Sequence, residues 1–259
     1  MRSSHPPRPD RTPKRVYLFG TCLVDMSHPD TGMAAIRLLK REGVRVIFPP
    51  DQSCCGQPAY NSGFPDEARE VARRQLRAFP EPHPVVVPSG SCAGMMRRHY
   101  PGLFAGDRDE RKARAFSERV FELTEFLGHV LRVRLTDRGE PIRVTWHSSC
   151  HAAREMDVIA ESKSLIRQLA NVELAELEHE DQCCGFGGTF SVKRPAISAA
   201  MVRDKIDDIR RTEAVRVLSG DHGCLMNITG AMDRRGIPVR GQHIADFLWE
   251  RTHGQSDRV

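Results

Sequence analysis

The sequence predicts an α/β protein built from two pseudo-repeated βαβ-type domains with parallel sheets, whose cysteine loops lie at the carboxyl ends of the strands. Two observations lead to this prediction. Short apolar runs alternate with amphipathic, helix-like segments, which is the pattern of parallel sheets with helical crossovers. The same order of elements and cysteines then occurs a second time, and such a repeat indicates a duplicated unit. In open sheets of this kind, ligands collect beyond the carboxyl ends of the strands.

The bulk composition is that of a soluble, ordered protein. The 259 residues suit two domains, and 39% hydrophobic with 28% charged residues is enough for a sizeable core. The net charge of +5 is spread along the chain and aromatic residues are only 6%, so no nucleic-acid partner is expected. No apolar stretch reaches the roughly 18 residues that span a bilayer. With no membrane span and no recognisable secretory signal, we expect a cytoplasmic protein whose cysteines stay reduced.

The first half predicts strand, helix, strand, helix and strand, with cysteines after each strand. Residues 1–14 carry four prolines and are expected to form a disordered tail outside the fold. A glycine stops the first helix, and a proline opens the second. The elements are an apolar run over 16–22 that ends at Cys22, a helix over 30–42, a strand over 44–48 before Cys54 and Cys55, a helix over 65–78, and a strand over 84–89 before Cys92.

The second half repeats this order. A charged, helix-like stretch over 107–133 joins the halves, and a turn-rich segment follows it. We place the domain boundary near Gly139, which gives domains over 15–139 and 140–259. The elements are a strand over 142–146 before Cys150, a helix over 156–170, a strand over 172–178 before Cys183 and Cys184, a helix over 195–211, and a strand over 214–219 before Cys224.

Each half carries one cysteine, a Cys-Cys-Gly triplet and a further cysteine. In the first half 31 residues separate the single cysteine from the triplet and 36 separate the second cysteine of the triplet from the last one; the corresponding numbers in the second half are 32 and 39. Thiolates that converge from separate loops, with glycine close by, are what an iron–sulfur cluster needs. The candidate cofactor and metal ligands are Cys22, Cys54, Cys55, Cys92, Cys150, Cys183, Cys184 and Cys224.

Other uses of these thiols fit the sequence less well. Zinc ligands usually come in pairs spaced C-x₂₋₄-C, and the chain contains no CxxC. The same absence argues against a thioredoxin-like dithiol. Buried free cysteines often act as small apolar residues, but that role does not explain a duplicated pattern. Structural zinc stays open as the main alternative.

The cysteine pattern and the segments around it resemble a known family. The pattern C-x31-CCG-x35-C and its second copy are similar to the CCG, or cysteine-rich, domain family, which includes the cysteine-rich subunit of heterodisulfide reductase and the glycolate oxidase iron–sulfur subunit. The segments FGTCLVDM, CCGQPAYNSG, PSGSC, SSCH, CCGFGGTFSVK and GCLMNITG resemble the lactate utilization protein A family more closely. This resemblance extends from Arg15 to about Trp249.

The resemblance implies an iron–sulfur subunit of a cytoplasmic L-lactate oxidation system, which takes lactate to pyruvate and enables growth on lactate. The subunit is expected to carry electrons and to belong to an oxidoreductase complex. Its implied partners are a ferredoxin-like iron–sulfur protein and a third, small subunit, and L-lactate is the substrate of the whole system.

One departure from the wider family affects the expected cofactor. In heterodisulfide-reductase-type domains the last element is a CxxC, which gives each site five cysteines. Here Ser89 and Asp221 stand three residues before Cys92 and Cys224. Each half therefore offers four thiolates, which suits two [4Fe-4S] clusters. Ser89 and Asp221 are expected to hydrogen-bond nearby, with an oxygen ligand as the alternative.

Three histidines lie next to cysteines in the sequence. His147 and His151 flank Cys150, and His222 comes two residues before Cys224. Each is a candidate hydrogen-bond donor, cluster ligand or proton relay, and the plainer interpretation is a loop histidine near solvent. The alternative function is a thiol–disulfide oxidoreductase of the heterodisulfide type, against which the missing fifth cysteine argues. A zinc scaffold that recruits partners is a third hypothesis.

Overall fold

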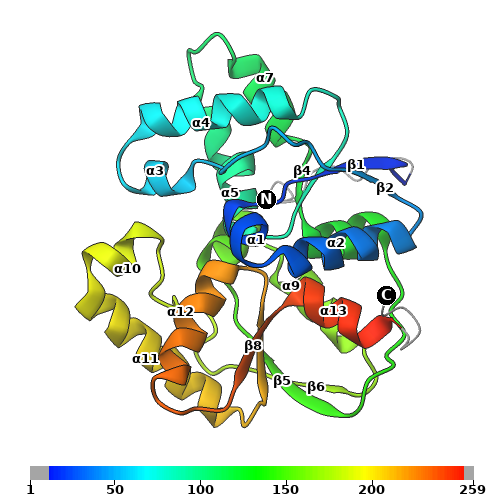
Figure 1. Cartoon of the computed structure of the whole chain (residues 1–259), viewed down its shortest axis with the longest axis vertical. Helices are drawn as coiled ribbons and strands as arrows, with labels where there is room; N and C mark the ends of the chain where they lie inside the picture. Colours follow the sequence, from blue (N-terminus) through cyan, green and yellow to red (C-terminus); the bar gives the residue numbers. More distant parts are fainter. Residues whose placement is uncertain (1–11, 254–259) are drawn as a thin grey trace.

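The computed structural model describes residues 12–253 and contains two four-stranded parallel sheets with helices packed around them (Figure 1). Most of the predicted N-terminal tail, residues 1–11, lies outside the described residues. The strand orders are β2-β1-β3-β4 and β6-β5-β7-β8, so the two sheets have the same topology. This confirms the α/β class, the parallel pairing and the duplication that the sequence predicts.

The first sheet is formed by residues 15–122. Its register pairs Tyr17 with Val85 and Val85 with Val120, which places β1 and β3 in the middle of the sheet. The elements are β1 (Arg15–Leu18), α1 (Cys22–Ser27), α2 (Pro29–Arg41), β2 (Arg45–Ile47), α3 (Gln57–Asn61), α4 (Pro65–Ala78), β3 (Val85–Val87), α5 (Gly90–Gly94), η1 (Met95–His99), α6 (Tyr100–Leu103), α7 (Glu110–Ser117), β4 (Val120–Glu122), α8 (Leu123–Glu125) and η2 (Phe126–Leu131), where η marks a π-helical turn.

The second sheet is formed by residues 142–243 with the same arrangement. Val144 pairs with Arg216, and Arg216 pairs with Arg240. The elements are β5 (Ile142–Trp146), η3 (Ala152–Met156), α9 (Ile159–Arg167), β6 (Val172–Ala175), α10 (Thr189–Lys193), α11 (Pro195–Arg211), β7 (Arg216–Ser219), α12 (His222–Asp233), β8 (Arg240–His243) and α13 (Ile244–Thr252).

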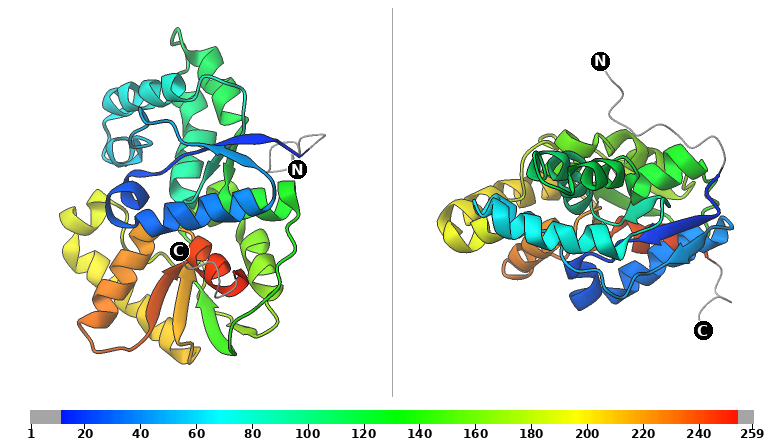
Figure 2. Two further views of the ribbon diagram at one scale, coloured as in Figure 1. Left: turned by 45° about the vertical axis from the view of Figure 1, so that its right-hand side comes forward. Right: turned by 90° about the horizontal axis from the view of Figure 1, so that it is seen from above.

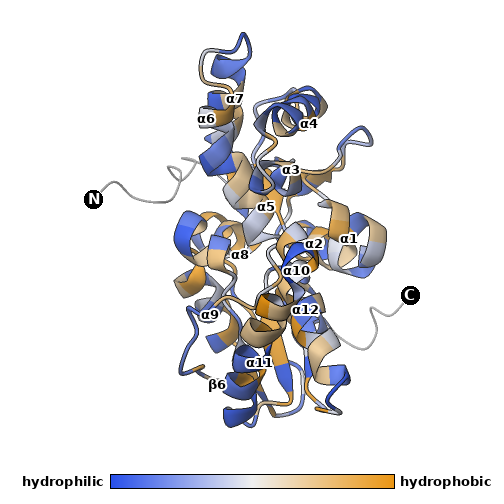
Figure 3. Ribbon diagram, turned by 90° about the vertical axis from the view of Figure 1, so that its left-hand side faces the viewer, coloured by the Kyte–Doolittle hydropathy of each residue, from blue (hydrophilic) through white to orange (hydrophobic). Residues whose placement is uncertain are grey.

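The longer helices follow the signals read in the sequence. Helices α4 and α11 occupy the predicted ranges, and each begins with proline, whose fixed φ suits the first helical turn. Helix α2 ends at Arg41, and Gly43 takes a φ of 76° just beyond it, a conformation in which glycine carries no steric cost. Figure 3 shows hydrophilic residues on the outward faces of α4 and α11.

The predicted helix-like stretch over 107–133 is wrong as a single element. Helix α7 ends at Ser117, and the chain then forms β4, which pairs with β3 before two short helical segments follow. Strand β4, Val120–Glu122, lies inside a charged stretch with helix-like spacing, which hides its three residues in the sequence. Pairing with a neighbouring strand overrides local propensity here. Strand β8, at the equivalent edge of the second sheet, was not predicted either.

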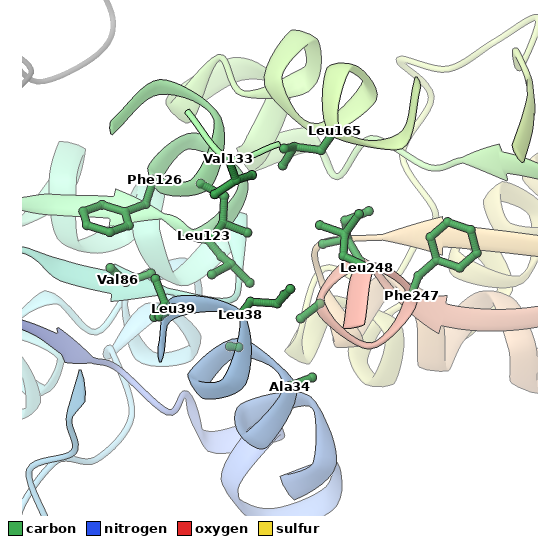
Figure 4. Packing of buried hydrophobic residues seen from close by; sticks show 14 of the residues in the cluster. Ala34, Leu38, Leu39, Val86, Leu123, Phe126, Val133, Leu165, Phe247 and Leu248 are labelled. Carbon is green, nitrogen blue, oxygen red and sulfur yellow. The ribbon is translucent and has the colours of Figure 1, made fainter. Parts of the chain in front are cut away.

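The two halves share one hydrophobic core. Figure 4 shows Leu38 of α2 directed toward Leu248 of α13 and Leu39 beside Val86 of β3, and Leu123 and Leu165 close the other side. Polar contacts also link α2 to α13, because the Thr31 hydroxyl donates to Asp246 Oδ2 at 2.6 Å and Arg41 donates to the Thr252 hydroxyl at 2.6 Å. A second apolar cluster joins the first half to Ala152, Met156 and Val158 of the second half, and a third lies within the second half alone.

The segment between η2 and β5 contains the expected domain boundary near Gly139, which remains a prediction. Arg251 of α13 covers this segment and donates to both carboxylate oxygens of Asp137, at 2.8 and 2.7 Å. Helices α2 and α13 pack together between the two sheets, as the left view of Figure 2 shows. Within residues 12–253, no helix is both long and apolar enough to cross a membrane.

Candidate metal centre

All eight cysteines line one cavity of about 190 Å³. Every cysteine follows the carboxyl end of a strand: β1, β2 and β3 in the first half, and β5, β6 and β7 in the second. This confirms the predicted placement beyond the strand ends. The sequence also predicted two separate sets of four, whereas the structure brings both sets to the walls of a common cavity between the halves.

In the first set the four thiols form two close pairs. The Sγ atoms of Cys22 and Cys54 are 4.0 Å apart, and those of Cys55 and Cys92 are 3.4 Å apart. A disulfide needs about 2.05 Å between its sulfurs, so these are free thiols. Cys55 is buried, and the Tyr100 hydroxyl holds its carbonyl at 2.9 Å.

The second set repeats this arrangement with histidines added. One ring nitrogen of His147 and the Sγ atoms of Cys184 and Cys224 lie within 4.8 Å of one another. His151 Nδ1 lies 3.5 Å from the Cys150 sulfur. The Asn227 amide donates to the Cys184 carbonyl at 2.7 Å, which is the role that a tyrosine hydroxyl has in the first set.

The glycine of each triplet brings the loop close to the helix that follows. Gly56 and Gly185 have φ values of 86° and 82°, and their backbone N–H groups donate to the sulfurs of Cys54 and Cys183 at 3.4 Å. A Cβ on Gly56 would lie 3.1 Å from the Ala68 carbonyl oxygen. Backbone conformation and packing therefore both select glycine at these positions.

Crowding of the thiols sets their proton affinities. A hydrogen bond from Cys22 lowers the pKa of Cys54 to about 3, and the same contact raises the pKa of Cys22 far above its usual range. A hydrogen bond from Cys150 lowers the pKa of Cys183 to about 2, while the neighbouring sulfurs and burial raise the pKa of Cys184. Each set thus holds a thiolate readily, but ionisation of all four thiols requires a positive charge among them.

Ser89 and Asp221, which stand where related domains have a fifth cysteine, contact each other between the halves. Ser89 Oγ donates to Asp221 Oδ1 at 2.7 Å, and the Ser91 hydroxyl donates to the same oxygen at 2.7 Å. The Ser149 hydroxyl donates to the other carboxylate oxygen. Ser89 also caps α5 by accepting from the Cys92 N–H at 3.2 Å. Both residues hydrogen-bond nearby as expected, and the structure identifies each as a partner of the other.

The histidines near the cysteines have three different environments. His147 is 1% exposed, neither of its ring nitrogens has a hydrogen-bond partner among the described residues, and burial lowers its pKa to about 4. His151 is half-buried beside Cys150. Burial and the adjacent His243 lower the pKa of His222 to about 2. The plainer interpretation as solvent-facing loop residues is therefore wrong for His147 and His222.

Sequence reasoning missed a second polar cluster next to the cavity. The rings of His28 and His222 stack at 3.8 Å, and those of His222 and His243 at 4.8 Å. Ring nitrogens of His222 and His243 and a carboxylate oxygen of Asp246 lie within 4.8 Å of one another, a set that could hold a cation. These residues come from distant parts of the chain, so no local sequence motif predicts that they lie together.

The cysteine cavity fits iron–sulfur chemistry on three features of the described residues. Each half supplies four free thiols from three loops, a number that suits a four-iron cluster. Gly56 and Gly185 already donate backbone N–H groups to the sulfurs. His147 leaves two buried nitrogens without protein partners beside Cys184 and Cys224. Buried polar atoms of this kind usually have a partner, and a bound cluster would supply one.

Comparison with known proteins places the chain in a family. The cysteine-rich domain (CCG) family matches residues 16–97 and 144–229, which are the two halves of the repeat. "Lactate utilization protein A" of Geobacillus sp. (strain WCH70) is 44% identical over 238 residues, covering 92% of this chain and all of that protein. The protein of the same name from Geobacillus kaustophilus is 45% identical over 235 residues, covering 90% of this chain and 98% of that one.

The fold also occurs in a solved structure of low sequence identity. A crystal structure of a hypothetical protein from Helicobacter pylori matches with a TM-score of 0.62 at 11% identity, and the match covers 98% of this chain and 52% of that one. This likeness concerns the fold alone. The relatives that match over nearly their whole length carry more weight, and the chain belongs to the lactate utilization protein A family of cysteine-rich domain proteins.

Proposed function

We propose that this protein is the iron–sulfur subunit of a cytoplasmic L-lactate oxidation system and that it carries electrons between lactate and a partner protein. The observation that carries the proposal is the cavity that all eight cysteines share. Cys22, Cys54, Cys55 and Cys92 would hold one [4Fe-4S] cluster, and Cys150, Cys183, Cys184 and Cys224 a second. The names of the relatives connect the chain to lactate utilization.

The electron balance of the reaction suits two cofactors in one cavity. Oxidation of L-lactate to pyruvate removes two electrons and two protons from the hydroxyl-bearing carbon and its oxygen. Four-iron clusters supply one-electron transfer, so two of them would take both electrons before passing them to a ferredoxin-like partner. A third small subunit would complete the system. The residues of this chain would hold the clusters, and the Ser89–Asp221 contact ties together the loops that precede Cys92 and Cys224.

Metal and sulfide analysis after anaerobic purification tests the proposal directly. The protein should be brown and contain about eight irons and eight acid-labile sulfides per chain, which is the content of two four-iron clusters. Cys54→Ser and Cys183→Ser should each lose about half of the iron, and the double variant all of it. Met226→Ala is the matched control, because this side chain, two residues after Cys224 on α12, is 43% exposed and does not line the cavity.

Three outcomes separate this proposal from its alternatives. A colourless preparation that contains zinc alone would overturn it in favour of a zinc scaffold. Pyruvate formation from L-lactate, with the partner proteins and an electron acceptor present, should depend on both cysteine sets. Reduction of a heterodisulfide without any lactate oxidation would identify a thiol–disulfide oxidoreductase instead.

A further inference from the structure

The two cysteine sets differ at the residue that stands three positions before their first cysteine. Phe19 holds this position in the first half and His147 in the second. Both follow the central strand of their sheet and both are buried, at 0% and 1% exposure. Phe19 packs in an apolar cluster against Phe79. The second copy of the repeat therefore has a polar histidine ring at the position where the first copy has an apolar phenylalanine ring.

The polar ring of His147 has no protein partner among the described residues, although its backbone is engaged. The His147 N–H donates to the Leu218 carbonyl at 2.8 Å, while both ring nitrogens stay unpaired within residues 12–253. A buried polar group without a partner lowers the stability of the folded state by about 1–3 kcal/mol. Such a ring is therefore expected only where another interaction offsets this loss. A ring nitrogen lies within 4.8 Å of the Cys184 and Cys224 sulfurs.

The position of His147 indicates a donor to sulfur and not a ligand of iron. His147 is absent from the residues that line the cavity, whereas Cys184 and Cys224 line it. The ring thus reaches these two thiols without lining the space that a cluster would fill. A neutral imidazole carries one N–H, and a thiolate bound to iron accepts hydrogen bonds.

We propose that His147 donates a ring N–H to the Cys184 or Cys224 thiolate and thereby gives the second cluster a higher reduction potential than the first. This inference rests on the proposed iron–sulfur function. Hydrogen bonds to the sulfurs help to set cluster potentials, because a donor stabilises the extra negative charge of the reduced state. Phe19 offers no such donor, so an electron entering at the first set would move on to the second.

Two further differences between the halves act in the same direction. His151 follows the first cysteine of the second set and has a ring nitrogen 3.5 Å from the Cys150 sulfur, whereas Leu23 holds the equivalent position in the first set. Lys205 lies wholly buried ten residues after the start of α11, where Gln75 stands in α4. The ring of His151 adds a donor beside the second set, and Lys205 adds a buried positive charge that Asp208 partly offsets, with its Oδ2 atom 3.8 Å from the Lys205 Nζ atom.

Redox titration followed by electron paramagnetic resonance tests this inference on the anaerobic protein. Cys54→Ser and Cys183→Ser backgrounds isolate the second and the first cluster, so each signal is assigned. His147→Phe should lower the midpoint potential of the second cluster toward that of the first and leave the first unchanged. The reciprocal variant Phe19→His should raise the potential of the first cluster alone.

Each result has a definite meaning for the inference. Unchanged potentials in His147→Phe, with about eight irons retained, would overturn the donor role while leaving the proposed function intact. Loss of about half the iron in His147→Phe would make His147 a ligand, which also contradicts the inference. Absence of iron from the wild type would overturn the proposed function itself.

A second measurement does not depend on the folding of any His147 variant. Both proteins in this comparison also carry His151→Leu, because the His151 ring nitrogen lies 3.5 Å from the Cys150 sulfur and would give a coupling of its own. The Cys54→Ser protein, labelled with ¹⁵N-histidine, should then show a weak ¹⁵N coupling to the remaining cluster in pulsed electron paramagnetic resonance, as a hydrogen-bonded His147 ring predicts. The Cys183→Ser protein should show none, because the first set has no histidine at the position of Phe19. A strong coupling indicates direct ligation, and no coupling in either protein contradicts the inference.

Discussion

Ser89 and Asp221 come from equivalent positions of the two repeats, and they hydrogen-bond to each other at 2.7 Å between the two cysteine sets. Asp221 is 3% exposed and accepts from the hydroxyls of Ser89, Ser91 and Ser149 as well as from the Ser91 N–H. A buried carboxylate is tolerated where several donors surround it. This contact ties the β3 loop of one half to the β7 loop of the other.

Asp221→Asn should destabilise the protein by about 3 kcal/mol, because hydrogen bonds to a charged acceptor are worth about 1.5–3 kcal/mol each and the amide offers one acceptor atom instead of two. Ser89→Ala removes a single donor and should cost about 1 kcal/mol. Anaerobic urea denaturation measures both changes. Full iron content in Asp221→Asn would be consistent with a purely hydrogen-bonding carboxylate, whereas loss of about half the iron would indicate an oxygen ligand.

Alanine at the glycine of a Cys-Cys-Gly triplet should lower the free energy of unfolding more than alanine at a glycine that has the same φ but no atoms near its Cβ position. Gly56 and Gly63 both have a φ of 86°, but only Gly56 would place a Cβ near other atoms, 3.1 Å from the Ala68 carbonyl oxygen. Gly63→Ala should lower the free energy of unfolding by about 1 kcal/mol, the strain of the left-handed conformation. Gly56→Ala should lower it further.

Gly185→Ala should have the largest effect, because its Cβ would lie 2.7 Å from the Ser198 carbonyl oxygen. Thermal unfolding and iron content should be compared across these alanine variants. Equal stability losses for Gly56→Ala and Gly63→Ala would show that the close approach of the loop to α4 does not add to the cost of a side chain at Gly56.

Glu122 should make stability depend on pH between about 4.5 and 7. Burial raises the pKa of this carboxyl from 4.5 to about 7, so the folded state binds the proton more tightly than the unfolded state. Its contribution is fully present below pH 4.5 and is lost as the pH rises through 7. The loss amounts to about 3 kcal/mol.

The matched control for Glu122 is Glu122→Gln, which keeps a side-chain oxygen to accept from the Thr124 N–H. Urea denaturation at pH 5 and pH 8 gives the pH effect for each protein. The wild type should lose more stability than Glu122→Gln between these values. Identical losses would mean that another group controls the pH dependence.

The shared core predicts that the two halves unfold together. Leu38 is fully buried between α2 and α13, and Leu38→Ala should lower the free energy of unfolding by about 3 kcal/mol. Met33→Ala on the same helix is the control, because Met33 is 45% exposed and such changes stay within about 0.5 kcal/mol. Hydrogen exchange should report one transition for both sheets in all three proteins. Opening of one sheet at lower urea would instead support independent domains divided near Gly139.

The amino-acid sequence by itself determined the duplicated α/β plan and the position of every cysteine beyond a strand end. These features depend on local signals. Helices α4 and α11 begin at prolines, Gly43 follows the end of α2, and short stretches rich in valine, isoleucine and leucine mark the central strands. Strand β4 was missed because it lies inside a charged stretch that resembles a helix, and β8 because its sequence, RGQH, holds no apolar residue. Both form by pairing with a neighbouring strand.

Tertiary structure alone decided how the two repeats meet. The sequence placed Ser89 and Asp221 132 residues apart and gave no sign that they touch, because the contact forms only when the loop after β3 packs against the loop after β7. For the same reason the sequence did not distinguish His147 from the two other histidines near cysteines. Its neighbours Cys184 and Cys224 were already candidate ligands. Periodicity and turn residues act over a few positions, whereas burial and the absence of a partner are properties of the packed molecule.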